Sequence, residues 1–119
     1  MDMNRMTIKL QEALQSASAL AMRRGHQGID VEHLLLALME QEGGIAGSLF
    51  EQAGVSPAAV RQAAEQALTK VAQVHGPGAA PGQIHLTPRL GSLLTKAEDR
   101  MKELRDEFVS VEHIILAMV

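Results

Sequence analysis

The sequence predicts an all-α domain: a tandem, pseudo-twofold repeat of a four-helix unit, with the second unit incomplete at residue 119. The first observation is the composition, because 46% of the residues are hydrophobic but only 2% are aromatic. A core of Ala, Leu and other aliphatic side chains is typical of helices, since Ala and Leu are strong helix formers. The second observation is that VEHLLLALM at 31–39 returns 80 positions later as VEHIILAMV at 111–119.

The first repeat is expected over residues 1–72 and begins with a long helix. Thr7 can cap the free N–H groups of its first turn, and the helix is predicted to continue to about residue 24. The residues GHQG at 25–28 then end it. Its inner stripe has the three- and four-residue spacing of a buried helix face and consists of Leu10, Ala13, Leu14, Ala17 and Ala21.

Three shorter helices are expected to complete the first repeat. Asp30 is the predicted cap of a helix over 31–42, which is apolar on nearly all sides and is therefore expected to be buried. A short helix is predicted over about 45–53, after a Gly-Gly pair. Ser56, followed by a proline at the first helical position, is the predicted cap of a helix that continues to about residue 71.

A Gly/Pro-rich linker is predicted over 73–86 and the second repeat over 87–119. The linker lacks the Gly-Lys-Ser/Thr ending of a phosphate-binding loop. Thr87 is predicted to cap a fifth helix to about residue 104, and Ser110 a sixth. When 7–38 is laid on 87–118 without gaps, nine of 32 positions are identical and fall on caps and core faces. Each repeat is therefore expected to bury its apolar face against the other.

The charge and the absence of several signals limit the function classes. The net charge is −3 and only 2% of residues are aromatic, which argues against nucleic acid as a partner. The chain has no cysteine, so neither disulfides nor thiolate metal sites are expected. The first ten residues lack an apolar signal core, and no apolar run reaches the length of a membrane span. We therefore expect a cytoplasmic location and no membrane contact.

No grouping of residues in the sequence predicts catalysis. His33 and His113 occupy equivalent helix starts, where a symmetric metal pair could be imagined, but only Glu32 or Glu112 adjoins each. A helix N-terminus favours a neutral, hydrogen-bonded imidazole, so both histidines are expected to be structural. The two glutamates are expected to be favourable charges at positive helix ends. We expect no enzyme activity, cofactor or metal in this segment.

Four stretches of the chain carry a family resemblance: MNRMTIKLQEALQSASALA, HQGIDVEHLLLALMEQEGG, GQIHLTPRL and LRDEFVSVEHIILA. Together they resemble the N-terminal substrate-interaction domain of the ClpB protein disaggregases, members of the Clp family of AAA+ unfoldases, over nearly the whole chain. The DEFVSVEH stretch and the EQEGG turn favour the ClpB branch over the protease-associated ClpA and ClpC branches.

The resemblance implies a domain that captures unfolded or aggregated polypeptides and hands them to a hexameric ring. ATP and Mg²⁺ would be bound by ATPase modules downstream of this segment, in a homohexamer that works with the DnaK chaperone system. The resemblance also associates chaperone activity with Thr7, Asp106 and Glu112. Because Thr7 and Glu112 begin helices, a loss of activity on their mutation could instead reflect lower stability.

The resemblance further implies an apolar client groove, partly on the helix before the DEF turn. This sequence departs from the family there, with Lys96 and Arg100 on that helix and His113 shortly after it. Deformable aliphatic surfaces suit clients that differ in sequence. The candidates for the groove floor, each with core packing as its alternative, are Leu93, Ala97, Met101, Leu104, Phe108 and Val109, of which Leu104 and Phe108 are expected to be the most exposed.

Two other functions are compatible with these residues. The first is an adaptor-docking domain, as in unfoldases that feed a protease, for which binding should fall steeply with salt. The second is a stand-alone helical interaction protein, such as a homodimer that completes its second repeat with helices of its partner. Light scattering would test the second possibility, because a monomer would argue against it.

Overall fold

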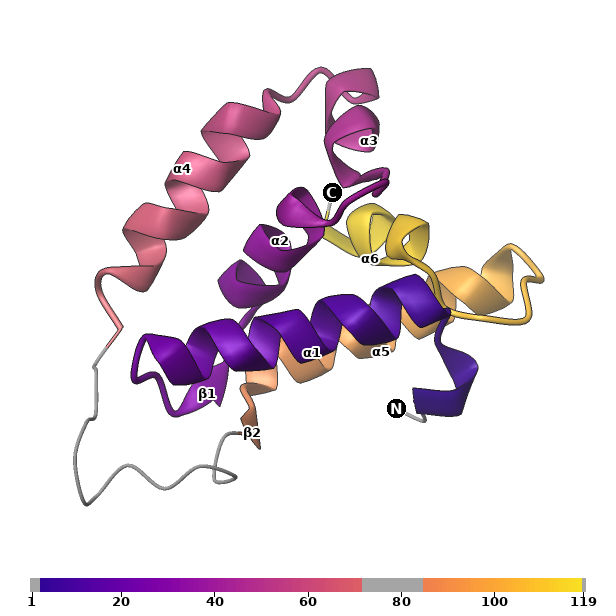
Figure 1. Ribbon diagram of the computed structural model, residues 1–119. Helices are drawn as coiled ribbons and strands as arrows, with labels where there is room; N and C mark the ends of the chain where they lie inside the picture. The colour runs from indigo at the N-terminus through magenta and orange to yellow at the C-terminus, as the bar shows by residue number, and fades with distance from the viewer. Residues whose placement is uncertain (1–2, 72–84, 119) are drawn as a thin grey trace.

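Helices make up most of the protein, and two of them are long. The computed structural model describes residues 3–71 and 85–118 (Figure 1). In chain order the elements are the 3-10 helix η1 (Met3–Arg5), α1 (Ile8–Arg23), β1 (Gly28–Ile29), α2 (Val31–Glu40), α3 (Ala46–Gln52), α4 (Pro57–Leu68), β2 (His85–Leu86), α5 (Pro88–Glu103) and α6 (Val111–Met118). The predicted all-α fold class is confirmed, with two-residue strands as its only addition in the described part of the chain.

The helices begin at the predicted caps. The Leu10 N–H donates to Thr7 Oγ1 at 3.3 Å, and the Leu90 N–H donates to Thr87 Oγ1 at 3.2 Å. Each hydroxyl satisfies a donor that the first helical turn would otherwise leave open. Ser56 caps α4 in the same way, and the Asp30 carboxylate caps α2 by accepting from the Val31 N–H at 2.7 Å.

Two of the helices end earlier than predicted. α2 ends at Glu40 rather than near residue 42, because the backbone of Gln41 is extended. The side-chain amide of Gln41 donates to the Lys9 carbonyl at 2.7 Å. α4 ends at Leu68 rather than near residue 71.

Paired backbone contacts relate the two repeats by the 80-residue shift. β1 and β2 are parallel, with Ile29 opposite Leu86. The equivalent contact is a parallel bridge between Met6 and Val109. Met6 lies 80 positions before Leu86, and Val109 lies 80 positions after Ile29. Residues 85–86, the last two of the predicted linker, form a strand whose backbone pairs with the first repeat. The rest of that predicted linker, 73–84, lies outside the described residues.

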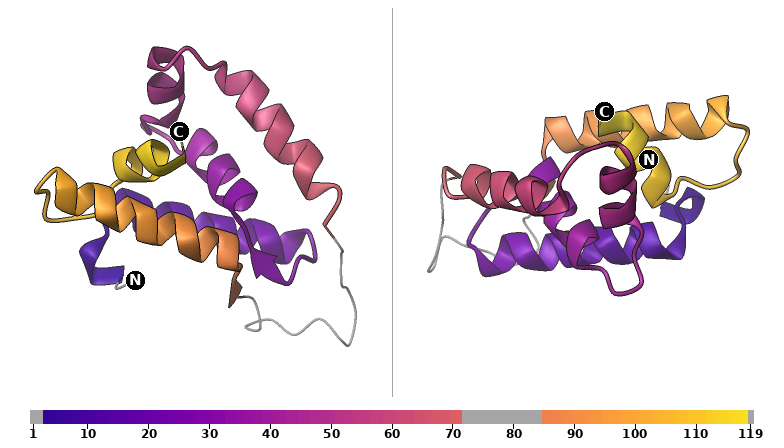
Figure 2. Two further views of the ribbon diagram at one scale, coloured as in Figure 1. Left: turned by 180° about the vertical axis from the view of Figure 1, so that it is seen from behind. Right: turned by 90° about the horizontal axis from the view of Figure 1, so that it is seen from above.

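The core lies between α1 and α5, which run in opposite directions on two sides of the domain (Figures 1 and 2). α2 and α6 lie between them. The buried stripe of α1 is the predicted one, and α5 repeats it at a shift of 80 with Leu90, Leu93, Leu94, Ala97 and Met101. Burial of such aliphatic faces is the main force that stabilises the fold.

The outer face of α2 is covered by α4. A second small cluster of buried side chains forms there from Leu36, Ala64 and Leu68. The Arg24 guanidinium reinforces the contact of α4 with the end of α1 through two hydrogen bonds to Glu65, at 2.7 and 2.8 Å. This ion pair raises the pKa of Arg24 and lowers that of Glu65, in each case chiefly through the shared hydrogen bonds.

Candidate protein-interaction surface

Four of the six residues predicted to line a groove belong to the core. Ala97, Met101 and Val109 are fully or almost fully buried, and Leu93 is only slightly exposed. Leu93, Ala97 and Met101 have the spacing of the buried stripe of α5. Val109 lies before α6, where its backbone bridges to Met6, so the fold explains the apolar character of all four residues. The expectation that Ala97, Met101 and Val109 form the floor of a groove is therefore corrected in favour of core packing.

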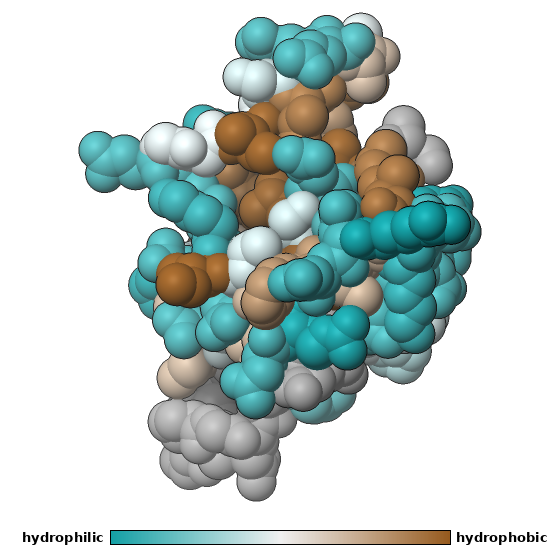
Figure 3. Space-filling view, turned by 90° about the vertical axis from the view of Figure 1, so that its right-hand side faces the viewer, coloured by the Kyte–Doolittle hydropathy of each residue, from teal (hydrophilic) through white to brown (hydrophobic). Residues whose placement is uncertain are grey.

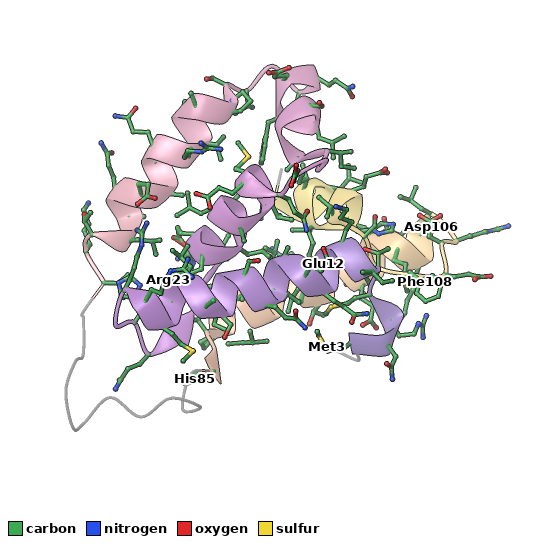
Figure 4. The ribbon with its side chains drawn as sticks, in the orientation of Figure 1. Met3, Glu12, Arg23, His85, Asp106 and Phe108 are labelled. Atoms are coloured by element: carbon green, nitrogen blue, oxygen red, sulfur yellow. The ribbon has the colours of Figure 1, made fainter. Side chains whose placement is uncertain are left out.

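Leu104 and Phe108 are exposed, as predicted. Leu104 exposes 56% of its surface and Phe108 48%, and both lie on the turn between α5 and α6. Between them Arg105 has a left-handed backbone, with φ at 59°, which usually favours glycine. Figure 4 shows Phe108 and Asp106 together at this end of the molecule. Exposed apolar side chains on a projecting turn are available for contact with another molecule.

Asp106 lies on the same turn and supports α6. Its carboxylate accepts from His113 Nε2 at 2.8 Å, while His113 Nδ1 accepts from the Ser110 N–H at 2.8 Å. His113 is buried and Asp106 is exposed. The contact holds the turn between α5 and α6 against the start of α6. Asp106 therefore has a structural role, in addition to any role in binding.

Thr7 and Glu112 come together in one small cleft. This cleft of about 230 Å³ is formed by the start of α1, the loop between α2 and α3, and the start of α6. Thr7 also caps α1, and its N–H donates to the Val109 carbonyl at 2.9 Å. The residues that line the cleft are Thr7, Lys9, Gln41, Gly43, Gly44, Ile45, Ser110, Val111 and Glu112.

The carboxylate of Glu112 differs from its counterpart in the first repeat. Glu32 is bound by Arg89 at 2.9 Å, and this contact raises the pKa of Arg89, first through the hydrogen bond and then through the charge of Glu32. Lys9 is the equivalent cation near Glu112, but it donates to the Glu42 carbonyl instead, at 3.1 Å. Within residues 3–71 and 85–118, Glu112 has no ion-pair partner. Its charge is therefore available to a basic group of another molecule.

Two exposed isoleucines near the cleft were not predicted. Ile45 lines the cleft, and Ile8 follows Thr7 at the start of α1 with 73% of its surface exposed. A sequence signal was present for Ile8, because it falls outside the buried stripe of α1. Figure 3 faces this end of the molecule and shows apolar side chains gathered over α3 and α6, with polar side chains below and around them.

A larger groove lies on another side of α2. It has a volume of about 650 Å³ and lies between α2, α3, α4 and α5. Leu93 is the one predicted groove residue that lines it, beside the basic side chains of Arg89 and Lys96. The remaining lining residues are Val31, Leu35, Phe50, Val60, Pro88, Ser92 and Met118.

The described part of the chain holds neither a metal cluster nor a membrane span. No three His, Asp or Glu side chains converge there in a way that could hold a metal ion. Both histidines at helix starts are instead buried and hydrogen-bonded, as predicted. None of the helices in residues 3–71 and 85–118 has the length and apolar character needed to cross a membrane.

Known proteins share both the sequence and the fold. The chaperone protein ClpB of Nitratidesulfovibrio vulgaris is 46% identical over 119 residues, which are 100% of this chain and 14% of that protein. The N-domain of ClpV from Vibrio cholerae has a TM-score of 0.79 at 23% identity, covering 96% of this chain and 66% of the solved one. A ClpV N-domain in complex with a VipB peptide has a TM-score of 0.77, also at 23% identity, covering 96% of this chain and 67% of that one.

These likenesses differ in what they establish. At 23% identity the two ClpV structures show the fold alone. The ClpB relative shows that the resemblance visible in the sequence is correct, although the chain spans only 14% of that protein's length. Residues 5–119 match the family described as the Clp repeat (R) N-terminal domain. Because this match covers nearly the whole chain, the protein belongs to the Clp repeat N-terminal domain family.

Proposed function

We propose that this domain captures unfolded or aggregated polypeptides for a ClpB-like disaggregase. The observation that carries the proposal is the exposed pair Leu104 and Phe108 on a turn whose central residue, Arg105, is left-handed. Neither side chain is needed to fill the core, and a left-handed non-glycine residue is unfavourable. A fold under selection for stability alone would favour polar side chains and a glycine on this turn.

The chemistry of the surface suits clients without a common sequence. Unfolded chains present scattered apolar side chains, so a few exposed aliphatic and aromatic contacts can bind many of them weakly. The cleft with Thr7 and Glu112 adds a negative charge for basic client residues. The known complex of a ClpV N-domain with a VipB peptide is a precedent for peptide binding by this fold.

The activity of a longer protein belongs to the same proposal. ATP and Mg²⁺ would be bound by downstream ATPase modules, in a cytoplasmic homohexamer that works with the DnaK system, while this domain itself catalyses nothing. Six weak client sites around one ring would raise the apparent affinity through effective concentration. The identity of 46% to a ClpB protein over this domain supports this wider assignment.

The domain boundaries also remain a proposal: repeat 1 over 1–72, a linker over 73–86 and repeat 2 over 87–119. Leu36 lies under α4, whereas its equivalent in the second repeat, Leu116, exposes 46% of its surface. In the same way, the loop before α3 lies over the start of α6, whereas the equivalent place beside Arg89 is the large groove. We propose that helices equivalent to α3 and α4 cover these places in a longer protein.

The test is a titration of the domain with a permanently unfolded polypeptide, such as reduced and carboxymethylated α-lactalbumin. We expect weak binding that Leu104→Ser and Phe108→Ser each reduce by about threefold or more, because each removes apolar contact area. Circular dichroism of both variants should match that of the unchanged protein, since both side chains are exposed.

The matched control is Val55→Ser, which changes an exposed apolar residue between α3 and α4. It should leave client binding unchanged. If the folded Leu104 and Phe108 variants bind the unfolded polypeptide as well as the Val55 variant does, the assignment of the turn is wrong.

Adaptor docking is the second candidate, and the observation that favours it is the Glu112 carboxylate, which lines the cleft and has no ion-pair partner within residues 3–71 and 85–118. Docking of a folded, charged partner should weaken steeply between low and high salt, whereas apolar client binding should change little. Repeating the titration at both salt concentrations, with Glu112→Gln beside the unchanged protein, distinguishes the two functions.

A further inference from the structure

A buried pair of histidines lies in the first repeat, and the proposed client site does not use it. His26 is on the turn after α1 and His33 is in the first turn of α2, and both are almost completely buried. Their rings meet edge to face, with His26 Nδ1 and His33 Nε2 2.8 Å apart. Two imidazoles in direct contact away from water form a group whose state depends on pH.

The hydrogen bonds define where the protons are. The Asp30 N–H donates to His33 Nδ1 at 2.9 Å, so that nitrogen is an acceptor. A neutral His33 therefore has its proton on Nε2 and donates it to His26 Nδ1. A neutral His26 must then have its own proton on Nε2. The Asp30 N–H and the two rings form one chain in which every contact joins a donor to an acceptor.

An added proton breaks this chain wherever it binds. On His33 Nδ1 it would face the Asp30 N–H, and on His26 Nδ1 it would face the Nε2 proton of His33. If the His33 proton moved to Nδ1 to avoid the second clash, the first would appear. Each arrangement turns one hydrogen bond into a contact between two donors and places a positive charge in a buried site.

The charged groups around the pair do not reverse this effect. Burial lowers the pKa of His33, the His26 ring and Arg24 act in the same direction, and Asp30 and Glu32 oppose them. These two carboxylates are already bound by Arg89, at 3.3 and 2.9 Å. The neutral form of His33, which donates its Nε2 proton to His26 Nδ1, is therefore favoured in the folded protein.

The second repeat has the same helix start but a different partner for its histidine. Asp106 takes the place of His26, and its carboxylate accepts from His113 Nε2. Ser110 takes the place of Asp30, and its hydroxyl lies 3.1 Å from His113 Nδ1. A proton added to Nδ1 can be donated to the Ser110 oxygen, because a hydroxyl accepts as well as donates. The Nδ1 side of His113 therefore has a hydrogen-bond acceptor beside it, whereas His33 Nδ1 faces the Asp30 N–H.

We propose that the His26–His33 pair is an acid-sensitive latch which holds the turn after α1 closed when neutral and opens it when protonated. The turn leads directly into β1, whose Ile29 carbonyl accepts from the Thr87 N–H at 3.0 Å. Opening the turn would release this contact between the repeats. The equivalent contact, from the Thr7 N–H to the Val109 carbonyl, would remain closed.

The sign of the pH dependence follows from linkage. A histidine whose pKa is lower in the folded state stabilises the fold above its ordinary pKa of about 6.5, and this stability is lost as the pH falls below that value. One such group changes the unfolding equilibrium constant by at most about tenfold per pH unit. We therefore expect unfolding to become easier between pH 7 and pH 5.

Urea unfolding of the 119-residue chain at pH 7 and pH 5 tests the proposal, with the variants His33→Gln and His113→Gln. In the first variant the glutamine side chain can still accept from the Asp30 N–H, because glutamine suits this position of a capping box. For each protein, the unfolding equilibrium constant at pH 5 is divided by that at pH 7. We expect this ratio to be several-fold smaller for His33→Gln than for the unchanged protein. His113→Gln, the matched change in the second repeat, should keep it. Equal pH dependence in His33→Gln and the unchanged protein would overturn the proposal.

Amide hydrogen exchange tests where the opening occurs. After correction for intrinsic exchange, acid should reduce the protection of the Thr87 N–H more than that of the Thr7 N–H. Equal loss of protection at both amides in the unchanged protein would contradict a local latch.

Discussion

The turn after α1 and the turn after α5 occupy equivalent places in the two repeats and form the same backbone hydrogen bonds, but they differ in how far their side chains are exposed. In the first, Gly25 and His26 are buried and Arg24 is bound to Glu65 of α4. In the second, all residues from 102 to 108 are exposed. The same helix–turn–helix unit thus provides a closed turn that stabilises the domain and an open turn that can contact other molecules. A duplication allows this division, because one copy can satisfy the fold while the other changes.

The outer faces of α2 and α6 provide the test with the largest expected effect. Leu36→Ala should lower the free energy of unfolding by about 2 to 5 kcal/mol, because Leu36 is 1% exposed in the cluster under α4. Leu116→Ala should change it by about 0.5 kcal/mol or less, since Leu116 is exposed. Urea unfolding of both variants measures the difference. Equal losses would mean that the two faces are covered alike.

Substitution of the two threonine caps should have an intermediate effect on the free energy of unfolding. Thr87→Ala should lower the free energy of unfolding by about 1 to 2 kcal/mol. The substitution removes the cap of α5 and the hydrogen bond that the Thr87 hydroxyl donates to Asp30 at 3.0 Å. Thr7→Ala removes only the cap of α1, so it should lower the free energy of unfolding by about 1 kcal/mol or less. Thermal unfolding compares them.

The same threonine separates stability from binding. Thr7→Ser retains a capping hydroxyl, so it should restore most of the stability that Thr7→Ala loses. Client titration of the serine variant then shows whether Thr7 contributes to binding beyond its cap. A serine variant of full stability that binds clients poorly would assign Thr7 to the interaction surface.

Gly25 and Arg105, the left-handed residues at equivalent positions of the two turns, are expected to give the smallest changes in the free energy of unfolding, with opposite signs. Arg105→Gly should stabilise the protein by up to about 1 kcal/mol, because glycine adopts a positive φ without strain. Gly25→Ala should destabilise it by about 1 kcal/mol, since Gly25 has φ at 72°. Denaturant unfolding measures both changes. If Arg105→Gly is more stable but binds clients less well, the strain at this turn is retained for function.

The sequence alone determined the elements and their repetition. Caps such as Thr7 and Thr87 and the stripe on α1 were predicted, because each depends on neighbours within one or two helical turns. The 80-residue shift was predicted because the two copies align without gaps. The structural histidines could be predicted for the same reason, since His33 and His113 accept from backbone N–H groups three residues earlier. The exposure of Leu104 and Phe108 also followed from their place on a turn.

Only the tertiary structure decided which apolar residues face the core and which charges have partners. Met101 and Val109 are as apolar as Leu104 and Phe108, and only packing against the other repeat buries the first pair. Likewise Glu32 and Glu112 share the local sequence Val-Glu-His, yet Arg89 binds Glu32 whereas Lys9 donates to the Glu42 carbonyl and not to Glu112. The contact of His26 with His33 and the strand pairing at residues 85–86 are further examples. All of these depend on how the helices pack, and no local pattern specifies that.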